Sequence, residues 1–300
     1  MKKKKILIIG GTGFIGYHLA KKCVSKNFIV TSLSTRKPKK IRKLKKIKYL
    51  VCDISKKKFL MQVVKNEYDY VVNLGGHVDH RNKLKTYQSH FLGLKNLVDI
   101  FVKKKIKSFI QIGSGGEYGK LKSPHSENQQ GKPNSIYYKS KLRASKLVSQ
   151  MYKKNKFPGI VLRLYQVYGP NQDLNRVIPI VVKNCLDDKK FDCSDGKQFR
   201  DFTYVEDVVD AILLSLNKKK AHGKIFNIGS SKIIKIKDLI HKINTIIGFG
   251  KPFYGKIKLR DDENIISYPS IKKANKILKW KPKISFNTGL KKTINEIKKR

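Results

Sequence analysis

The sequence predicts an α/β protein in which a doubly wound parallel sheet is followed by a smaller α/β lobe on the C-terminal side. Short runs rich in Ile, Val and Leu alternate with longer amphipathic stretches, and this order gives a parallel sheet with helices on both faces. The chain has 300 residues, about twice the size of a common single domain. With 40% apolar residues it is too hydrophobic to be disordered.

Six buried strands are predicted from compact apolar runs that end in Gly, Ser, Asn or a following loop. Their ranges are 5–9, 28–33, 47–52, 70–74, 108–112 and 159–164. Three amphipathic stretches between them are long enough for three or more helical turns. These helices are expected at 14–25, 87–103 and 135–152.

After residue 164, Gly and Pro interrupt shorter elements, so a second lobe is predicted to begin there. The apolar stretch 205–216 and the strand-like 224–228 are compatible with a return to the first lobe. We therefore expect residues 1–165, together with 205–228, to form the first domain. Residues 166–204 and 229–300 are expected to form the second.

The net charge of +47 arises from 68 Lys plus Arg against 21 Asp plus Glu. Most of these cations are lysines spread along the whole chain, whereas nucleic-acid readers rely on Arg forks and stacked aromatic rings. No nucleic-acid partner is therefore predicted. One cluster, residues 37–48, holds eight basic residues and no acid, and forms either a polyanion patch or a solvated loop.

Targeting signals and membrane spans are not predicted. Four opening lysines are followed by only four apolar residues before glycines intervene, which is too short for a signal peptide. The apolar runs are too short to cross a bilayer, so no membrane partner is expected. The four cysteines contain no C-x-x-C pair and lie in or beside apolar runs. They are predicted to be buried thiols in a reducing compartment, and the protein is expected in the cytoplasm.

The first strand leads into Gly10-Gly11-Thr12-Gly13-Phe14-Ile15-Gly16 and then into a helix. Glycines in this context allow a tight turn, let backbone amides approach a pyrophosphate and bring the helix close to the strand. The sequence therefore predicts a Rossmann-type dinucleotide site. Its binding residues are expected to be Gly10, Gly13, Phe14, Ile15 and Gly16.

The second strand is followed by Ser34-Thr35-Arg36, and no acidic residue occurs before Asp53. NAD sites usually place Asp or Glu here, on the adenosine ribose. Hydroxyl and guanidinium groups instead suit a 2′-phosphate. We therefore predict NADP as the preferred cofactor, with NAD as the alternative, and assign Ser34 and Arg36 to its binding.

Tyr137 and Lys141 are four residues apart at the start of a predicted helix, which places both side chains on one face. A phenol is a poor acid or base at neutral pH until nearby positive charge stabilises its phenolate, and Lys141 supplies such a charge. Ser114 follows the fifth strand, at the edge where these sheets bind ligands. A catalytic site is predicted from Ser114, Tyr137 and Lys141.

With the glycine turn and these three residues in this order, the chain resembles the extended short-chain dehydrogenase/reductase family, in its sugar-nucleotide epimerase and dehydratase branch. The similarity extends over nearly the whole chain. Further similar segments are Asp53-Ile54, Leu162-Arg163-Leu164-Tyr165-Gln166-Val167-Tyr168-Gly169-Pro170, Gln198-Phe199-Arg200-Asp201-Phe202, Phe226-Asn227-Ile228-Gly229, Trp280-Lys281-Pro282 and Gly289-Leu290.

The resemblance implies hydride chemistry on a hexose linked to a nucleoside diphosphate. Tyr137 would be the acid or base, Lys141 would tune it, both would contact the cofactor, and Ser114 would orient the reacting oxygen. Asp53 and Ile54 would contact the adenine. The residues assigned to the substrate are Gln166, Arg176 and Arg200, the last on the diphosphate. A homodimer through helices 87–103 and 135–152 is also implied.

Departures from the family pattern narrow the reaction. The family's 4,6-dehydratases have Asp-Glu after the serine, and decarboxylating members keep the Glu, whereas this chain has Gly115 and Gly116. Glu117 comes one residue later and is interpreted as a loop carboxylate. Asn73 and Gly75-Gly76 replace the family's usual His-Leu-Ala-Ala beside the cofactor ribose. His77-Val78-Asp79-His80 offers too few ligands for a metal, so no metal is predicted and this loop is expected to line the cleft.

Two reactions remain. The preferred prediction is an NADPH-dependent 4-ketoreductase of a nucleoside-diphosphate 4-keto-6-deoxyhexose, and the alternative is a 4-epimerase with retained NAD. Arg36 and Gln166, which replaces an Asn of many epimerases, favour the reductase. The tail beginning Arg260-Asp261-Asp262-Glu263 also resembles that of reductases producing deoxysugars. A non-catalytic NADP-binding protein is the remote alternative.

Overall fold

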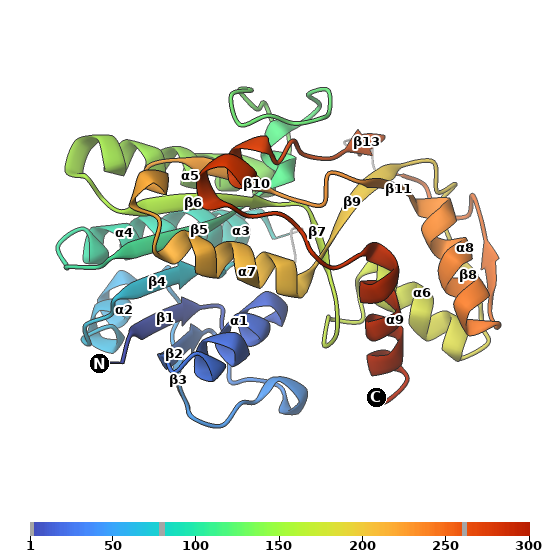
Figure 1. The fold of residues 1–300 in the computed structure, drawn as a ribbon, viewed down its shortest axis with the longest axis horizontal. Coiled ribbons are helices and arrows are strands. Elements are labelled where there is room, and N and C mark those ends of the chain that lie inside the picture. The colour runs from blue at the N-terminus through green and yellow to red at the C-terminus, as the bar shows by residue number, and fades with distance from the viewer. Residues whose placement is uncertain (1–2, 78–81, 260–262) are drawn as a thin grey trace.

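The computed structural model describes residues 3–77, 82–259 and 263–300, and its larger part is a parallel sheet (Figure 1). The strand order is β10-β6-β5-β4-β1-β2-β3, with every neighbouring pair parallel. The order reverses between β1 and β4, the point where such sheets open a crevice at the strands' carboxyl ends. The predicted doubly wound α/β fold is confirmed. The strands are β1 (Lys5–Ile9), β2 (Ile29–Ser34), β3 (Ile47–Val51), β4 (Tyr70–Asn73), β5 (Ser108–Ser114), β6 (Gly159–Leu164) and β10 (Ile225–Ile228).

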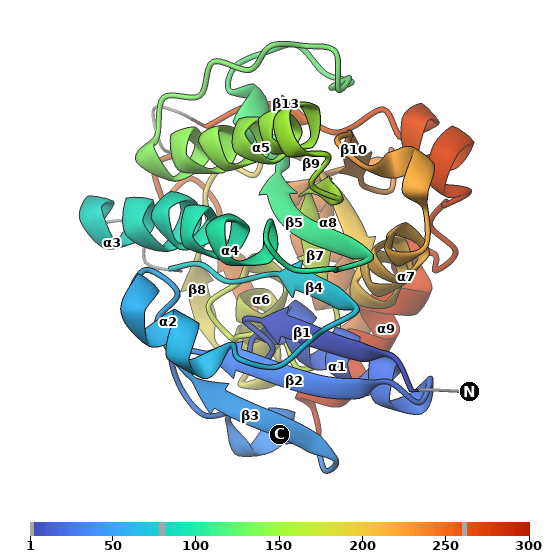
Figure 2. The same ribbon diagram turned by 90° about the vertical axis from the view of Figure 1, so that its left-hand side faces the viewer.

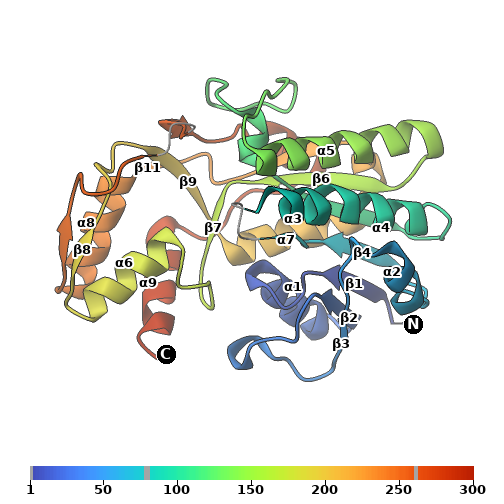
Figure 3. The ribbon, with the colours of Figure 1, turned by 180° about the vertical axis from the view of Figure 1, so that it is seen from behind.

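Helices cover both faces of this sheet (Figures 2 and 3). Successive residues of β1 enter different cores: Ile6 and Ile8 pack on one side, and Leu7 and Ile9 on the other. Because both faces are buried, the strands read as continuous apolar runs. One layer contains α1 (Phe14–Ser25) and α7 (Val205–Leu216), and the other contains α2 (Lys57–Val63), α3 (Lys83–Tyr87), α4 (Gly93–Phe101) and α5 (Ile136–Asn155).

The second part of the chain lies beside the carboxyl edge of the sheet, on the right in Figure 1. Strands β7 (Gln166–Tyr168), β9 (Phe199–Tyr204), β11 (Ile233–Lys235) and β13 (Ile266–Ser267) form one small sheet. Strands β8 (Lys190–Asp192) and β12 (Lys251–Phe253) form another. Helices α6 (Val177–Leu186), α8 (Ile236–Ile247) and α9 (Phe286–Ile297) contribute to a separate apolar core.

The helix predicted at 87–103 begins earlier, at Lys83, and includes the π-helical turn η2 (Gln88–Leu92). Gly93 follows this turn, and a Cβ there would lie 2.5 Å from Ile54 Cγ1. This packing joins segments far apart in the sequence, so apolar periodicity could not predict the turn. The remaining short helices are η1 (Lys40–Arg42), η3 (Gly115–Tyr118), η4 (Lys219–Ala221) and η5 (Ala274–Leu278).

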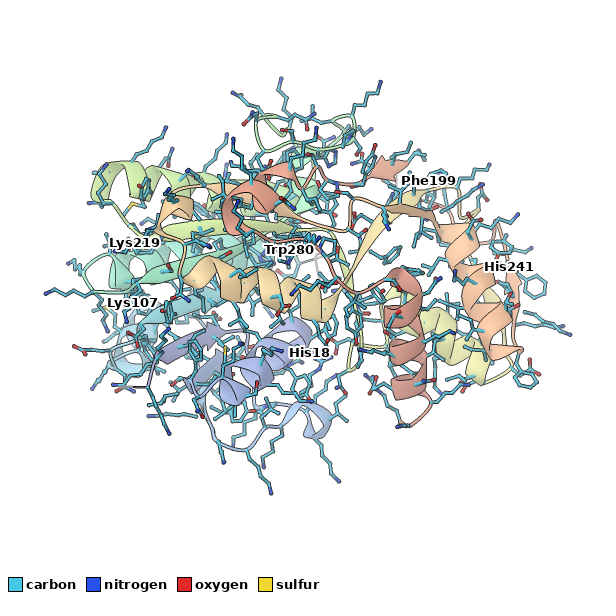
Figure 4. All side chains as sticks on the ribbon, in the orientation of Figure 1. His18, Lys107, Phe199, Lys219, His241 and Trp280 are labelled. Carbon is cyan, nitrogen blue, oxygen red and sulfur yellow. The ribbon has the colours of Figure 1, made fainter. Side chains whose placement is uncertain are left out.

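Lysine side chains extend outward on all sides of the ribbon, as a dispersed surface charge would (Figure 4). The cysteines Cys23, Cys52, Cys185 and Cys193 are free and buried, as predicted. Across the described ranges, no helix combines the length and apolar character that a membrane span requires.

The segment after η5 is fixed to the first turn of α7. Trp280, which is 1% exposed, donates its indole N–H to the carbonyl oxygen of Asp207 at 2.9 Å (Figure 4). The buried carboxylate of Asp207 accepts the backbone N–H groups of Lys283 at 2.9 Å and Ile284 at 3.1 Å. One acidic side chain therefore connects the C-terminal segment to the helix that covers the sheet.

Replacing Asp207 by Ala is expected to reduce the free energy of unfolding by about 1–3 kcal/mol, because two backbone N–H groups lose their acceptor. The midpoint of denaturant unfolding, followed by circular dichroism, measures this change. Asp187→Ala is the matched control, because Asp187 lies on the surface and pairs with the exposed Lys183 and Lys189. Equal midpoints for the two variants would show that the Asp207 carboxylate does not stabilise the attachment of the C-terminal segment to α7.

Candidate active site

A cleft of about 770 Å³ opens where the strand order reverses. Its walls come from β1, β2, β4, β5, α5 and the loops of the second lobe. It brings together every residue that the sequence assigns to cofactor, catalysis or substrate. These lining residues are Gly10, Gly13, Phe14, Ile15, Gly16, Ser34, Arg36, Asp53, Ile54, Ser114, Tyr137, Lys141, Gln166, Arg176 and Arg200.

The glycine turn has the geometry that a pyrophosphate site requires. Gly10 has φ +75°, and its N–H donates to the carbonyl of Leu33 at 2.7 Å. A Cβ on Gly16 would lie 2.2 Å from the Gly10 carbonyl oxygen, so only glycine allows α1 to approach this closely. Gly13 caps α1 without a side-chain hydrogen bond, leaving the first N–H groups of the helix for a ligand. The turn therefore fits a dinucleotide.

The adenosine end of the cleft is lined by Ser34, Arg36 and Asp53. Ser34 Oγ accepts the N–H of Thr12 at 3.3 Å and thereby ties β2 to the glycine turn. Arg36 is exposed. The carboxylate of Asp53 accepts the N–H of Ser55 at 2.8 Å. No acidic residue follows β2 directly.

Arg42 belongs to the basic cluster at residues 37–48, and the charge pattern in the sequence does not distinguish it from the other basic residues there. Its side chain is 4% exposed and pairs with Asp173 at 3.0 Å. Arg42 Nε also donates to the carbonyl of Asn171 at 3.0 Å. The cluster therefore contains a buried anchor that joins the loop after β2 to the loop after β7. In the sequence, Arg42 differs from the other basic residues of the cluster in being an arginine among lysines.

The catalytic candidates converge from two elements. Ser114 ends β5, while Tyr137 and Lys141 lie one turn apart on α5, whose first turn is capped by Ser135. Lys141 is buried and its Nζ donates to the Ile112 carbonyl at 2.8 Å. The same Nζ lies 6.0 Å from the centre of the Tyr137 ring. Tyr137 itself is partly exposed to the cleft.

Burial governs the acidity of both side chains. It raises the pKa of the Tyr137 phenol, and Tyr138 and Glu117 add to this rise while Arg176 opposes it. Burial lowers the pKa of Lys141 to about 8, although the negative charge of Glu117 acts in the opposite direction. At neutral pH the phenol is therefore a proton donor beside a charged ammonium that stabilises the phenolate left behind.

Glu117 is a buried anchor, and its interpretation as a loop carboxylate is wrong. It is fully buried and accepts the N–H of Ser114 at 2.7 Å, the hydroxyl of Ser145 at 2.7 Å and Arg163 Nε at 2.8 Å. Ser114 and Glu117 form a capping box around η3. The spacing of Ser and Glu three residues apart was the signal that could have identified it.

The two glycines after Ser114 face aromatic rings. A Cβ on Gly116 would lie 1.9 Å from the ring of Tyr138, and one on Gly115 would lie 2.7 Å from the ring of Tyr165. Both tyrosines line the cleft. The space that an acidic pair would need at these positions is therefore occupied.

Arg200 lines the cleft but is already engaged by protein groups. Its Nη1 donates to the carbonyl of Phe199 at 2.7 Å, and its Nη2 pairs with Glu263. A diphosphate would therefore share this guanidinium with Glu263. The rest of the similar tail segment, residues 260–262, lies outside the described residues.

The predicted His77-Val78-Asp79-His80 loop is only partly described. His77 lines the cleft, whereas residues 78–81 lie outside the described residues. Within the ranges that the structure does describe, no group of three or more His, Cys, Asp or Glu side chains is arranged to hold a metal ion.

Comparison with known proteins identifies the class. Residues 6–229 match the NAD dependent epimerase/dehydratase family. A Methanocaldococcus jannaschii protein, named provisionally as a UDP-glucose 4-epimerase, is 33% identical over 98% of this chain and 98% of its own. The chain therefore belongs to the NAD dependent epimerase/dehydratase family, which confirms the resemblance.

Solved structures of epimerases have the same fold as this chain. The UDP-glucose 4-epimerase of Thermotoga maritima, solved with UDP-glucose, has a TM-score of 0.93 and 26% identity over 98% of this chain and 99% of its own. The UDP-glucuronic acid 4-epimerase of Bacillus cereus, solved with UDP-glucuronic acid and NAD, has a TM-score of 0.89. It is 26% identical over 98% of this chain and 99% of its own.

The lowered pKa of Lys141 predicts how kcat/KM depends on pH. The ammonium is present below its pKa of about 8 and is lost above it, so kcat/KM should be constant at lower pH and fall as pH rises through this value. Lys141→Arg, which stays charged, should move the fall to higher pH. A pH profile of kcat/KM measures both, with Lys139→Ala, an exposed position on the same helix, as control. A wild-type profile without this fall would show that the charge of Lys141 does not control kcat/KM.

Proposed function

We propose that this protein is an NADPH-dependent 4-ketoreductase acting on a nucleoside-diphosphate 4-keto-6-deoxyhexose. The proposal rests on the residues that surround Ser114. Tyr137 and Lys141 provide one proton donor and its supporting charge, while the two positions after Ser114 provide no carboxylate for the elimination of water. Such a site suits the transfer of one hydride and one proton.

We assign the side chains the following roles in this reaction. The reduced nicotinamide supplies the hydride that a 4-keto carbon accepts. Tyr137 donates its proton to the keto oxygen, which becomes a hydroxyl, and Ser114 holds the same oxygen. Lys141 stabilises the resulting phenolate. Arg200 is assigned to the diphosphate, and Gln166 and Arg176, which line the same cleft, to the substrate.

NADP rather than NAD is proposed from the end of β2. Ser34 and Arg36 line the cleft there and no carboxylate follows the strand, so a 2′-phosphate would meet a hydroxyl and a guanidinium. Asp53 and Ile54 are proposed to contact the adenine. The division into two domains, the cytoplasmic location and the homodimer through α4 and α5 stay predictions.

A 4-epimerase that retains NAD is the second candidate. It is favoured by the two solved 4-epimerases, one of which binds NAD, and by the exposure of Arg36. In that reaction Tyr137, supported by Ser114 and Lys141, would take the proton of the 4-hydroxyl while the hydride of C4 passes to the bound nicotinamide. The hydride would then return to the opposite face of C4, and the proton to the 4-oxygen. The two reactions differ in net consumption of cofactor.

The main test is oxidation of NADPH by the purified protein with a panel of nucleoside-diphosphate 4-keto-6-deoxysugars, followed by absorbance. Wild-type protein should oxidise NADPH, and Tyr137→Phe should reduce kcat by about 100-fold or more because the proton donor is lost. Tyr152→Phe, a change of the same kind farther along α5, is the control. Interconversion of a UDP-hexose without net oxidation would instead establish the epimerase.

Cofactor choice has its own test. Arg36→Ala should raise the KM for NADPH by about 10- to 100-fold, because a charge-assisted contact with the 2′-phosphate is removed. The KM for NADH, which lacks that phosphate, should change little. Lys37→Ala, one residue along the same exposed segment, controls for loss of positive charge. Equal effects on the two cofactors would contradict the assignment of Arg36.

A further inference from the structure

A histidine that neither the sequence motifs nor the proposed mechanism uses lies against the catalytic tyrosine. His90 belongs to the π-helical turn η2, is 5% exposed and lines the cleft. Its ring meets that of Tyr137 edge to face, with the centroids 4.9 Å apart and the planes at 77°. The contact joins the turn before α4 to the second residue of α5.

The orientation of this imidazole is fixed by the segment that follows β4. His90 Nε2 lies 3.0 Å from the carbonyl oxygen of His77, and because a carbonyl only accepts, Nε2 carries the proton. The N–H of His77 in turn donates to Ser89 Oγ at 2.9 Å. Two neighbouring residues of η2 therefore hold the backbone of His77 by its donor and by its acceptor.

Gly76 provides the room for this ring. A Cβ added to Gly76 would lie 1.9 Å from His90 Cε1 and 2.4 Å from Nδ1, closer than any real contact. Gly76 is exposed and does not have the positive φ that favours glycine. Neither burial nor backbone conformation explains this glycine, whereas the position of the imidazole does.

We propose that His90 is a positioning residue for Tyr137, and that Gly76 is glycine because any side chain there would displace the imidazole. Lys141 contacts the Tyr137 ring from within α5, and His90 contacts it from η2. Together they restrict the ring to the orientation in which its hydroxyl faces the reacting oxygen held by Ser114. The inference deepens the proposed function and rests on it for the identity of that oxygen.

A double-mutant cycle tests the proposal with whichever reaction the wild-type protein performs. His90→Asn and Gly76→Ala should each lower kcat by about tenfold or more, with the thermal midpoint nearly unchanged. In the His90→Asn background, Gly76→Ala should cost less than about twofold, because no ring remains to displace. If the two substitutions lowered kcat independently, so that their fold-losses multiplied in the double variant, the proposal would be overturned.

Two further variants separate a positioning role from a structural one. His90→Phe keeps a ring edge against Tyr137 but loses the bond to His77, so it should recover part of the kcat lost in His90→Asn. His241→Asn, an exposed histidine on α8 at the far end of the second lobe (Figure 4), should leave kcat unchanged. A His90→Phe variant as slow as His90→Asn with a lowered thermal midpoint would show a structural role instead.

A readout independent of turnover is the fluorine NMR signal of Tyr137 in protein labelled with fluorotyrosine, assigned by its loss in Tyr137→Phe. The signal should shift in His90→Asn and in Gly76→Ala, and Gly76→Ala should add no further shift when His90 is Asn. An unchanged signal would overturn the proposal. Wild-type protein that neither reduces nor epimerises its substrates would overturn the proposed function, and the NMR signal would still decide the contact between His90 and Tyr137.

Discussion

The active site depends on one buried carboxylate, that of Glu117. It accepts hydrogen bonds from the N–H of Ser114, from the hydroxyl of Ser145 on α5 and from Arg163 on β6. These partners belong to the three elements that frame the reacting end of the cleft. A buried ion pair adds little net stability compared with apolar packing, but losing one partner leaves an uncompensated charge. Its value here is geometric, because it fixes Ser114 relative to the helix that carries Tyr137 and Lys141.

The same charge opposes part of the effect of burial on the acidity of the site. Lys141 is buried, which favours its neutral form, and the negative charge of Glu117 is the influence that resists this. The ammonium therefore persists near neutral pH, where the proposed mechanism requires it to support the phenolate of Tyr137. Around this centre, Tyr138 and Tyr165 fill the space next to Gly116 and Gly115. The site therefore places a phenol beside an ammonium, and the two positions after Ser114 carry no carboxylate that could take part in an elimination.

The sheet and the gathering of the site residues could be predicted from the sequence. Strands β1 and β6 and helix α1 have the predicted bounds, because buried parallel strands are continuous apolar runs with glycine or loop residues at their ends. Residues that follow different strands meet because the carboxyl ends of parallel strands share one edge. Ser114 and the glycine turn were found on this basis.

The residues that could not be predicted are those whose role is set by contacts distant in sequence. Glu117 is held by Ser145 and Arg163, which are distant in sequence, and only its capping contact with Ser114 is local. Arg42 is held by Asp173 and Asn171. The contact of His90 with Tyr137 requires a π-helical turn that apolar periodicity does not register. The engagement of Arg200 by Glu263 likewise joins β9 to a distant loop. In each case the residue type was visible in the sequence but its partner was not.

We propose that this site delivers one hydride to C4 and one proton to the keto oxygen of a nucleotide-linked sugar, without removing water. The most direct measurement is the mass of the sugar product formed with NADPH carrying deuterium at the transferred position. A 4-ketoreductase should give one deuterium at C4 for each NADP⁺ formed, with the oxygen of the former ketone retained as a hydroxyl. An isomerised sugar free of deuterium, or a product that has lost water, would contradict the proposal.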